Sequence, residues 1–123
     1  MPTMPRLLVI DDEPLLIDAI RRMLTGEAQV TPCNSVEDAF AHLGQGESFD
    51  AILCDLHMSG RSGIEFHAEL SRTTPQLAAR LGFVTGGAVD DEGQDFISAH
   101  SERVLEKPFS RSALREMLKL LLA

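Results

Sequence analysis

Short apolar runs alternate five times with segments of helical periodicity, and this alternation restricts the possible folds more than any other feature of the sequence. The runs lie at about 6–10, 28–32, 51–54, 81–84 and 103–105. Continuous apolar runs of this length are typical of strands that are buried on both faces of a sheet. Strands that alternate with helices are typical of a parallel sheet covered by helices on both sides. We therefore predict a single α/β domain over residues 1–123.

Five helices are predicted between and after these strands, at about 14–24, 35–43, 62–71, 90–99 and 110–122. Pro14 is a favoured first helical residue, and Ser35 and Ser110 are favoured caps. The segment 73–75, which ends in proline, is predicted to end the third helix. Pro32 has no N–H for a sheet hydrogen bond, so the second strand is predicted to lie at an edge.

The composition of the chain excludes several functional classes. A net charge of −8 argues against the basic face that the phosphates of a nucleic acid would need, so no nucleic-acid partner is expected. No apolar run approaches the roughly 20 residues that span a bilayer, and the start of the chain lacks the apolar stretch of a signal peptide. Neither the two cysteines, Cys33 and Cys54, nor the four histidines show metal-ligand spacing, and no disulfide is expected. We therefore predict a cytoplasmic protein without membrane contact.

Polar residues follow four of the apolar runs at the point where each run ends. Asp11 and Asp12 follow the first run, Asp55 the third and Thr85 the fourth, and Lys107 comes shortly after the last. The carboxyl ends of parallel strands lie at one edge of the sheet, where open α/β folds bind their ligands. We therefore expect three carboxylates, a hydroxyl and an ammonium group to converge at this edge.

These groups suggest a metal and a reaction. Neighbouring carboxylates repel one another unless a cation joins them. Oxygen ligands without histidine or cysteine select Mg²⁺ or Mn²⁺ over zinc, and Mg²⁺ is the better match to a few carboxylates with open positions for water. An ammonium group and a hydroxyl beside such a cation suit phosphoryl transfer. Asp55 stands alone on its loop whereas Asp11 and Asp12 form a pair, so Asp55 is the candidate nucleophile and the pair is the candidate metal site.

In these residues the sequence resembles the receiver domains of two-component response regulators. The matching segments occur in order at the ends of four predicted strands: Leu8–Glu13, Cys54–Met58 with Gly63 downstream, Val84–Gly86 and Glu106–Phe109. The segments 85–87 and 104–109 are most similar to receivers attached to hybrid sensor kinases. The resemblance extends from about Arg6 to Leu122. It implies a flavodoxin-like (CheY-like), doubly wound sheet of five parallel strands in the order 2-1-3-4-5, with five helices.

The resemblance also implies a role for each carboxylate. Asp55 would accept a phosphoryl group from a histidine kinase or a histidine phosphotransfer domain. Asp12 would bind Mg²⁺ directly and Asp11 largely through water, and the backbone carbonyl of His57 would complete the protein ligands. Such a domain catalyses only its own phosphorylation and dephosphorylation, so it is not expected to act as an enzyme on other substrates.

The remaining implications concern the switch. Thr85 and Lys107 would bind the phosphoryl group, and the Thr85 hydroxyl would follow it as the conformation changes. The peptide bond between Lys107 and Pro108 is predicted to be cis, which only a bond before proline adopts at low cost. A downstream protein partner would bind a surface formed by the helix at 90–99, the strand at 103–105 and the helix at 110–122. The expected oligomeric state is a monomer or a weak dimer that depends on phosphorylation.

Three positions raise separate questions. Val104, three residues before the lysine, occupies a position where such families usually carry an aromatic switch residue, so the usual coupled rotation of ring and hydroxyl cannot occur. Ser59 replaces a proline that commonly follows Met58, which is expected to loosen that loop. Leu15 falls off the apolar stripe of its helix and is either a peripheral core contact or a docking contact for a partner helix.

Two other functions stay open on the sequence alone. A binding module could keep the fold and signal without phosphate, which Val104 favours and the intact polar cluster opposes. A phosphohydrolase with an aspartyl nucleophile would need an acid or base two residues after Asp55, where this chain has His57. It would also need a cap segment to enclose its substrate, and the sequence contains none.

Overall fold

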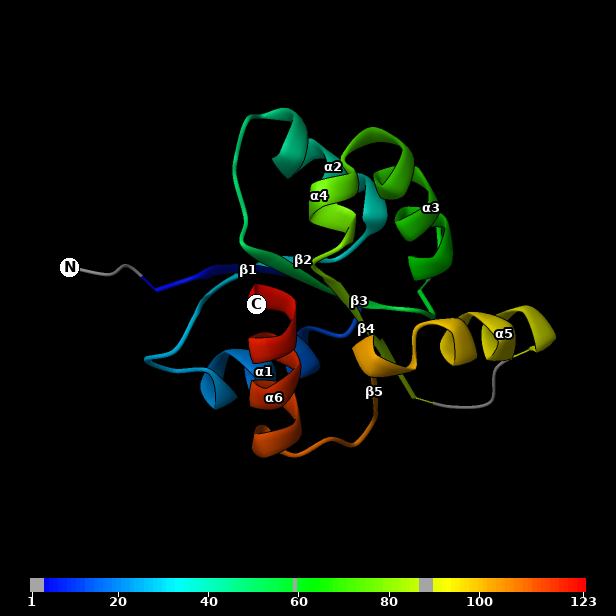
Figure 1. Cartoon of the computed structure of the whole chain (residues 1–123). Coiled ribbons are helices and arrows are strands. Elements are labelled where there is room, and N and C mark those ends of the chain that lie inside the picture. The colour runs from blue at the N-terminus through cyan, green and yellow to red at the C-terminus, as the bar shows by residue number, and fades with distance from the viewer. Residues whose placement is uncertain (1–3, 59, 87–89) are drawn as a thin grey trace.

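The computed structural model describes residues 4–58, 60–86 and 90–123, and its centre is a five-stranded parallel sheet (Figure 1). The strands are β1 (Arg6–Ile10), β2 (Gln29–Cys33), β3 (Ala51–Asp55), β4 (Leu81–Thr85) and β5 (Val104–Glu106). Their order across the sheet is β2-β1-β3-β4-β5, which confirms the expected order. The strand that contains Pro32 lies at an edge, as its missing N–H predicts. Ser59 and Gly87, singled out in the sequence, lie outside the described residues.

In the described parts of the chain six helices surround the sheet, one more than the sequence predicts. They are α1 (Pro14–Met23), α2 (Val36–Gly44), α3 (Gly63–Thr73), α4 (Pro75–Ala78), α5 (Asp91–Ala99) and α6 (Arg111–Leu122), with a 3-10 helix η1 (Ser101–Arg103). The break after α3 is present, but the expected count of five helices is wrong because α4 begins at Pro75 itself. Proline suits the first position of a helix, where its fixed φ is helical and its missing N–H is not needed.

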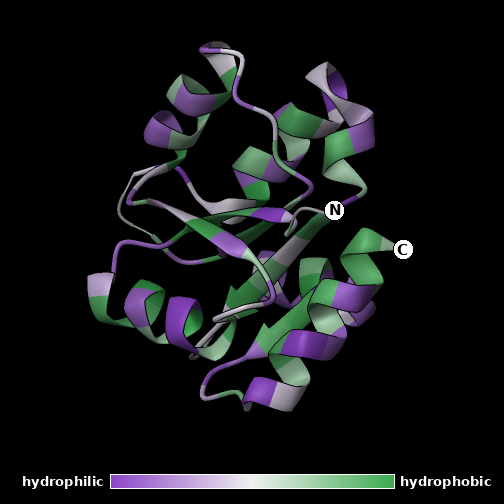
Figure 2. Ribbon diagram, turned by 90° about the vertical axis from the view of Figure 1, so that its left-hand side faces the viewer, coloured by the Kyte–Doolittle hydropathy of each residue, from purple (hydrophilic) through white to green (hydrophobic). Residues whose placement is uncertain are grey.

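Two apolar layers join the helices to the two faces of the sheet. In Figure 1, α1 and α6 lie on one side of the sheet and α2, α3 and α4 lie on the other. Leu7 and Val9 of β1 belong to the layer under α1 and α6, whereas Leu8 and Ile10 belong to the opposite layer. Successive side chains of a strand point to opposite faces, so a strand that is covered on both sides must be apolar throughout. Figure 2 shows the helices around the sheet with both hydrophilic and hydrophobic residues, as one-sided burial requires.

The register of the sheet places the strand ends side by side. Asp55 is the register partner of Val84, and Thr85 is the register partner of Glu106. The ladder continues one residue further, because the N–H of Lys107 donates to the carbonyl of Thr85 at 2.7 Å. The residues that end β3, β4 and β5 therefore leave the sheet at the same edge.

Leu15 lies outside both apolar layers. Its side chain is 81% exposed on α1, although it is a large apolar residue. Of the two interpretations of this residue, the structure excludes a core contact. Docking of a partner helix stays a prediction.

Candidate functional site

Three carboxylates meet at the carboxyl edge of the sheet, from the loop after β1 and the end of β3. Oxygen atoms of Asp11, Asp12 and Asp55 all lie within 4.8 Å of one another. Asp11 is 2% exposed and Asp55 is 3% exposed, whereas Asp12 is exposed to solvent. The fold thus brings together the three acidic residues that the sequence placed at this edge, two of them buried.

Lys107 brings a positive charge to these carboxylates from the loop after β5. Its Nζ donates a hydrogen bond to Asp55 Oδ2 at 3.3 Å, and lies 3.5 Å from Asp11 Oδ2 and 3.7 Å from Glu13 Oε1. Gly86 leaves room for the stem of this lysine, because a Cβ at position 86 would lie 2.7 Å from Lys107 Cδ. The peptide bond that follows Lys107 is cis, as the sequence predicts.

Burial and charge act on these groups in opposite directions. Burial, together with the charge of Asp55, raises the pKa of Asp11 to about 6, against the lowering effect of the Glu13 N–H and of Lys107. Burial alone would lower the pKa of Lys107, but the carboxylates of Asp55 and Asp11 outweigh it and raise this pKa above its usual value. The cluster therefore carries more negative than positive charge, and a divalent cation would balance it.

Backbone N–H groups fix the orientation of both buried carboxylates. The N–H of His57 donates to Asp55 Oδ1 at 3.0 Å, and the N–H of Glu13 donates to Asp11 Oδ1 at 2.8 Å. Each bond spans two residues and closes a turn directly after a strand. Asp55 thus has one oxygen bound by the backbone and the other beside Lys107. The ring of His57 is exposed, and the metal contact through its backbone carbonyl stays a prediction.

Thr85 ends β4 at the same edge and is 6% exposed. Across the residues that the structure describes, its Oγ1 is the one buried side-chain oxygen or nitrogen without a hydrogen-bond partner. A buried polar group without a hydrogen-bond partner destabilises the folded state by about 1–3 kcal/mol. A hydrogen bond from this hydroxyl to a ligand at the same edge of the sheet would remove that cost.

Replacing Thr85 with valine should raise the free energy of unfolding by about 1 kcal/mol, because valine keeps the shape and removes the unpaired hydroxyl. Urea unfolding followed by circular dichroism measures this, since the chain has no tryptophan or tyrosine. Thr73→Val is the matched control. The Thr73 hydroxyl is exposed and donates to the Glu69 carbonyl at 3.0 Å, so its loss should change stability by about 0.5 kcal/mol at most. A clear loss of stability in Thr85→Val would contradict the prediction.

Residues 7–119 match the family model of the response regulator receiver domain. The chain belongs to this family. The hydrogenase transcriptional regulatory protein HoxA of Cupriavidus necator is 36% identical to this receiver over 95 residues, which cover 77% of the receiver and 18% of HoxA. The two-component response regulator ARR2 of Arabidopsis thaliana is 34% identical over 101 residues, which cover 72% of the receiver and 15% of ARR2. The receiver therefore spans less than a fifth of the length of either relative.

A solved structure shows the same fold for the receiver. The CheY-like receiver domain protein of Methanospirillum hungatei superposes on this receiver with a TM-score of 0.82 and 21% sequence identity. The match covers 98% of this receiver and 94% of the other chain. At this identity the likeness concerns the fold alone.

In the ranges 4–58, 60–86 and 90–123 the receiver has no helix that is long and apolar enough to cross a membrane.

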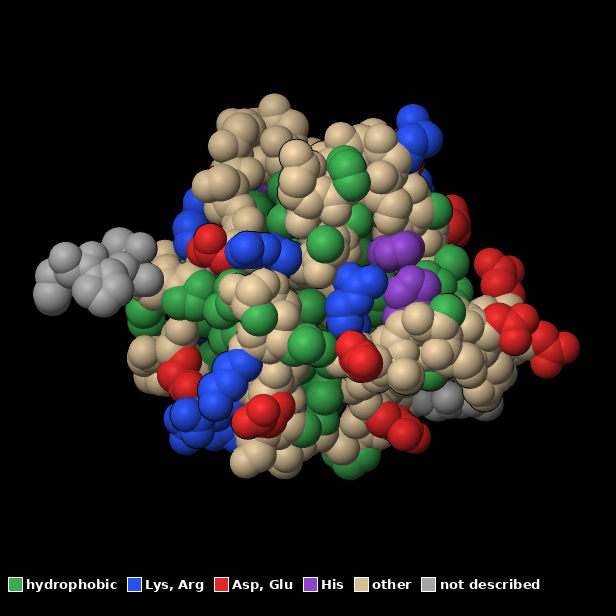
Figure 3. Space-filling model, viewed as in Figure 1, with side chains coloured by type: hydrophobic (Ala, Val, Ile, Leu, Met, Phe, Trp, Pro, Cys, Tyr) green, Lys and Arg blue, Asp and Glu red, His purple; other side chains and the backbone are tan. Residues whose placement is uncertain are grey.

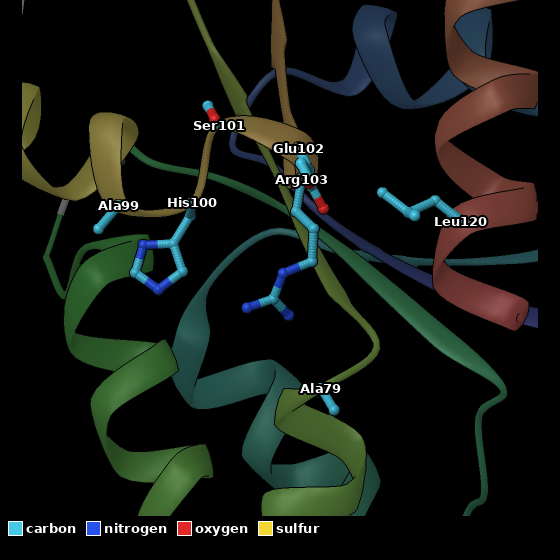
Figure 4. Close-up of a pocket in the computed structure, with 7 residues that line it drawn as sticks. All are labelled: Ala79, Ala99, His100, Ser101, Glu102, Arg103 and Leu120. Atoms are coloured by element: carbon cyan, nitrogen blue, oxygen red, sulfur yellow. The ribbon is translucent and has the colours of Figure 1, made fainter.

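The surface expected to bind a downstream partner consists of α5, β5 and α6. A hollow of about 300 Å³ opens on it, lined by Ala79, Ala99, His100, Ser101, Glu102, Arg103 and Leu120 (Figure 4). Beside it, Nη1 of Arg103 donates to the carbonyls of Ala78 and Leu81, and Leu120 is 44% exposed. These residues lie where β4 and β5 begin, so the hollow is at the opposite edge of the sheet from the carboxylates.

Val104 is half-buried against the apolar layer that contains Phe83, its register partner in β4. Phe83 belongs to a group of rings that the sequence did not predict. The rings of Phe96 and His100 stack with centroids 4.1 Å apart, and Phe83 meets Phe96 edge-on at 4.8 Å. His67 completes the group, with its ring centroid 4.8 Å from that of His100. Figure 3 shows histidine side chains at the surface beside α5 and acidic side chains at the far end of that helix. The rings come from α3, β4 and α5, so no local sequence pattern reveals them.

Proposed function

We propose that this receiver accepts a phosphoryl group on Asp55 in a reaction that depends on Mg²⁺, and that the phosphoryl group switches a protein-binding surface. The observation that carries the proposal is the position of Asp55, whose side chain is buried and accepts a hydrogen bond from Lys107. A carboxylate oxygen of Asp55 lies within 4.8 Å of carboxylate oxygens of Asp11 and Asp12. An oxygen of Asp55 would form the bond to phosphorus as the bond to a histidine nitrogen of the donor breaks. The donor would be a histidine kinase or a histidine phosphotransfer domain.

The donor set at this edge fits a hard divalent cation. Asp11, Asp12, Asp55 and the backbone carbonyl of His57 would hold Mg²⁺, and Mn²⁺ would also fit oxygen ligands of this kind. When bound, the cation supplies charge neutralisation for the phosphoryl oxygens. Lys107 would bind one of these oxygens, and the unpaired Thr85 hydroxyl would donate to another.

The affinity for Mg²⁺ should fall below about pH 6. Asp11 has a pKa of about 6 in the metal-free protein, so below that pH the cation must displace a proton from it. We expect roughly a tenfold loss of affinity for each pH unit below this value, and little change above it. Isothermal titration calorimetry from about pH 5 to 8 measures the effect. Asp11→Asn should bind more weakly and without this slope, and a wild-type affinity that stays constant down to pH 5 would refute the prediction.

Phosphate incorporation tests the proposed function directly. The receiver is incubated with a small acyl phosphate, with and without Mg²⁺, and its intact mass is measured. We expect the mass of one phosphoryl group to be added only with Mg²⁺, and Asp55→Asn to abolish the addition. Asp95→Asn, an exposed carboxylate on α5, should be modified like the wild type. An unmodified wild type, or equal modification of Asp55→Asn, would overturn the proposal, and sustained turnover of phosphate esters would favour a phosphohydrolase instead.

The partners follow from the same proposal. The downstream protein would bind the surface of α5, β5 and α6, where Leu120 and the adjacent hollow are exposed. Leu15, at the start of α1, would contact a helix of the phosphoryl donor.

Because Val104 replaces the usual aromatic ring, the switch would act through the packing of α5 on β4 and not through the rotation of a ring at this position. We expect a single cytoplasmic domain that is monomeric or weakly dimeric when phosphorylated, without nucleic-acid or membrane contact.

A further inference from the structure

A second set of metal-ligand side chains lies outside the acidic site, between β2 and α2. One ligand atom each from Cys33, Asp38 and His42 lies within 4.8 Å of the other two. Cys33 is the last residue of β2, whereas Asp38 and His42 stand four residues apart on α2 and so share one face of that helix. We propose that these three side chains form a zinc site.

The chemistry of the donors selects the ion. A thiolate and an imidazole with one carboxylate suit zinc and similar ions, whereas the oxygen ligands around Asp55 suit Mg²⁺. Zinc bonds of about 2.0–2.3 Å place tetrahedral ligands roughly 3.3–3.8 Å apart. The ligand atoms lie at most 4.8 Å apart, so they need to approach one another by no more than about 1.5 Å. Rotamer adjustment of the half-buried Asp38 and His42 allows a movement of this size. On binding, the Cys33 thiol gives its proton to solvent as the zinc–sulfur bond forms, and one coordination position stays open for water.

A neighbouring carboxylate prepares the histidine for this role. Nδ1 of His42 is hydrogen-bonded to Oε2 of Glu47. The other oxygen of this carboxylate, Oε1, lies 3.4 Å from Nη2 of Arg6. The hydrogen bond from His42 lowers the pKa of Glu47, so this carboxylate is ionised and accepts a hydrogen bond from the Nδ1–H group. With Nδ1 as the donor in this hydrogen bond, Nε2 is the ring nitrogen that would bind the metal. A carboxylate that orients a ligand histidine in this way recurs behind protein zinc sites.

The proposed site is held in place by the cap of α2 and is accessible from solvent. Ser35 caps α2 by accepting a hydrogen bond from the N–H of Asp38 at 3.0 Å, which fixes the turn that carries this carboxylate. A surface hollow of about 320 Å³ reaches Cys33 and Asp38 and provides a path for an ion. Asp11 lines this hollow as well, and its N–H donates to the carbonyl of Cys33 at 2.9 Å. The proposed zinc site is therefore adjacent to the phosphoryl-acceptor site but uses different ligands.

Sequence spacing did not indicate this site. Cys33 and His42 are separated by a strand end, a loop and a helical turn, so neither belongs to a short metal-binding motif. Only the packing of α2 against β2 brings the thiol to the ring. The absence of metal-ligand spacing along the sequence is therefore compatible with a cluster that forms only in the folded chain.

Titration with Co²⁺ in saturating Mg²⁺ tests the proposal, because Mg²⁺ occupies the oxygen ligands and a cobalt–thiolate bond absorbs in the near ultraviolet. We expect one equivalent of Co²⁺ to produce this absorption, and Cys33→Ser to abolish it. Asp38→Asn and His42→Gln, at half-buried positions, should weaken binding at least about tenfold and keep the fold. Cys54→Ala and His100→Gln are the matched controls and should bind like the wild type. Circular dichroism checks the fold of every variant.

Competition between the receiver and a chromophoric chelator then measures zinc affinity. Glu47→Gln, which removes the charge behind His42, should weaken zinc binding by about 10–100-fold without touching the metal. A wild type without thiolate absorption would overturn the proposal, as would equal absorption in folded Cys33→Ser. Unchanged zinc affinity in both Asp38→Asn and His42→Gln would overturn it even if Cys33→Ser failed to fold. The Asp55→Asn variant should bind zinc normally, which separates this result from the proposed phosphorylation.

Discussion

Replacing Lys107 with alanine should slow phosphorylation of the receiver by about 100-fold, the usual effect of removing one preorganised donor from a charged transition state. The Lys107 Nζ lies 3.3 Å from Asp55 Oδ2 and 3.5 Å from Asp11 Oδ2. Without it, two buried carboxylates lose the ammonium that lies between them, and the incoming phosphoryl group loses a binding partner. The rate of phosphate incorporation from a small acyl phosphate at saturating Mg²⁺ measures the effect.

Two further variants define what the lysine contributes. Lys119→Ala removes the other lysine of the chain, whose side chain is 73% exposed on α6, and should leave the rate unchanged. Lys107→Arg keeps the charge but replaces a compact ammonium with a planar group, so we expect an intermediate rate. A Lys107→Ala rate within about threefold of the wild type would exclude a direct role for Lys107 in phosphoryl transfer.

An alanine at position 63 should destabilise the receiver by about 3 kcal/mol, the upper range for overpacking a tight contact. Gly63 is the first residue of α3, and a Cβ there would lie 2.7 Å from the carbonyl oxygen of Asp55 and 3.1 Å from Leu56 Cα. Both atoms belong to the backbone, so the clash cannot be relieved by moving a side chain. The loop after β3 must shift, and we also expect slower phosphorylation of Asp55. Urea unfolding and the phosphorylation rate are the two measurements.

A glycine-to-alanine substitution at a position without close neighbours should stabilise the receiver instead. Gly44 is the last residue of α2, and a Cβ at this position would meet no described atom within 4 Å beyond its own helix backbone and chain neighbours. Alanine in a helix is more stable than glycine by roughly 0.5–1 kcal/mol, so Gly44→Ala should gain stability. If Gly63→Ala were as stable as the wild type, the close contact between α3 and the Asp55 carbonyl would be wrong.

The ends of the strands were predictable from the sequence because they depend on local order along the chain. Each apolar run marks a strand buried on both faces, and the polar residue after it must lie where the strand leaves the core. Asp11, Asp55, Thr85 and Lys107 were placed at one edge in this way, and the structure places them there. The short helix α4 was missed because Pro75 was interpreted only as the end of α3 and not as the start of a new helix.

The sequence by itself determined the strands, the edge position of Pro32 and the residues that gather at the carboxyl edge, because each follows from hydrophobic pattern and backbone chemistry within a few residues. Only the tertiary structure decided which side chains touch. The unpaired hydroxyl of Thr85, the contact of Gly63 with Asp55 and the approach of Cys33 to α2 all depend on how separate elements pack. Side-chain packing between distant segments leaves no periodic signal in the chain, so these features emerge only once the core has formed.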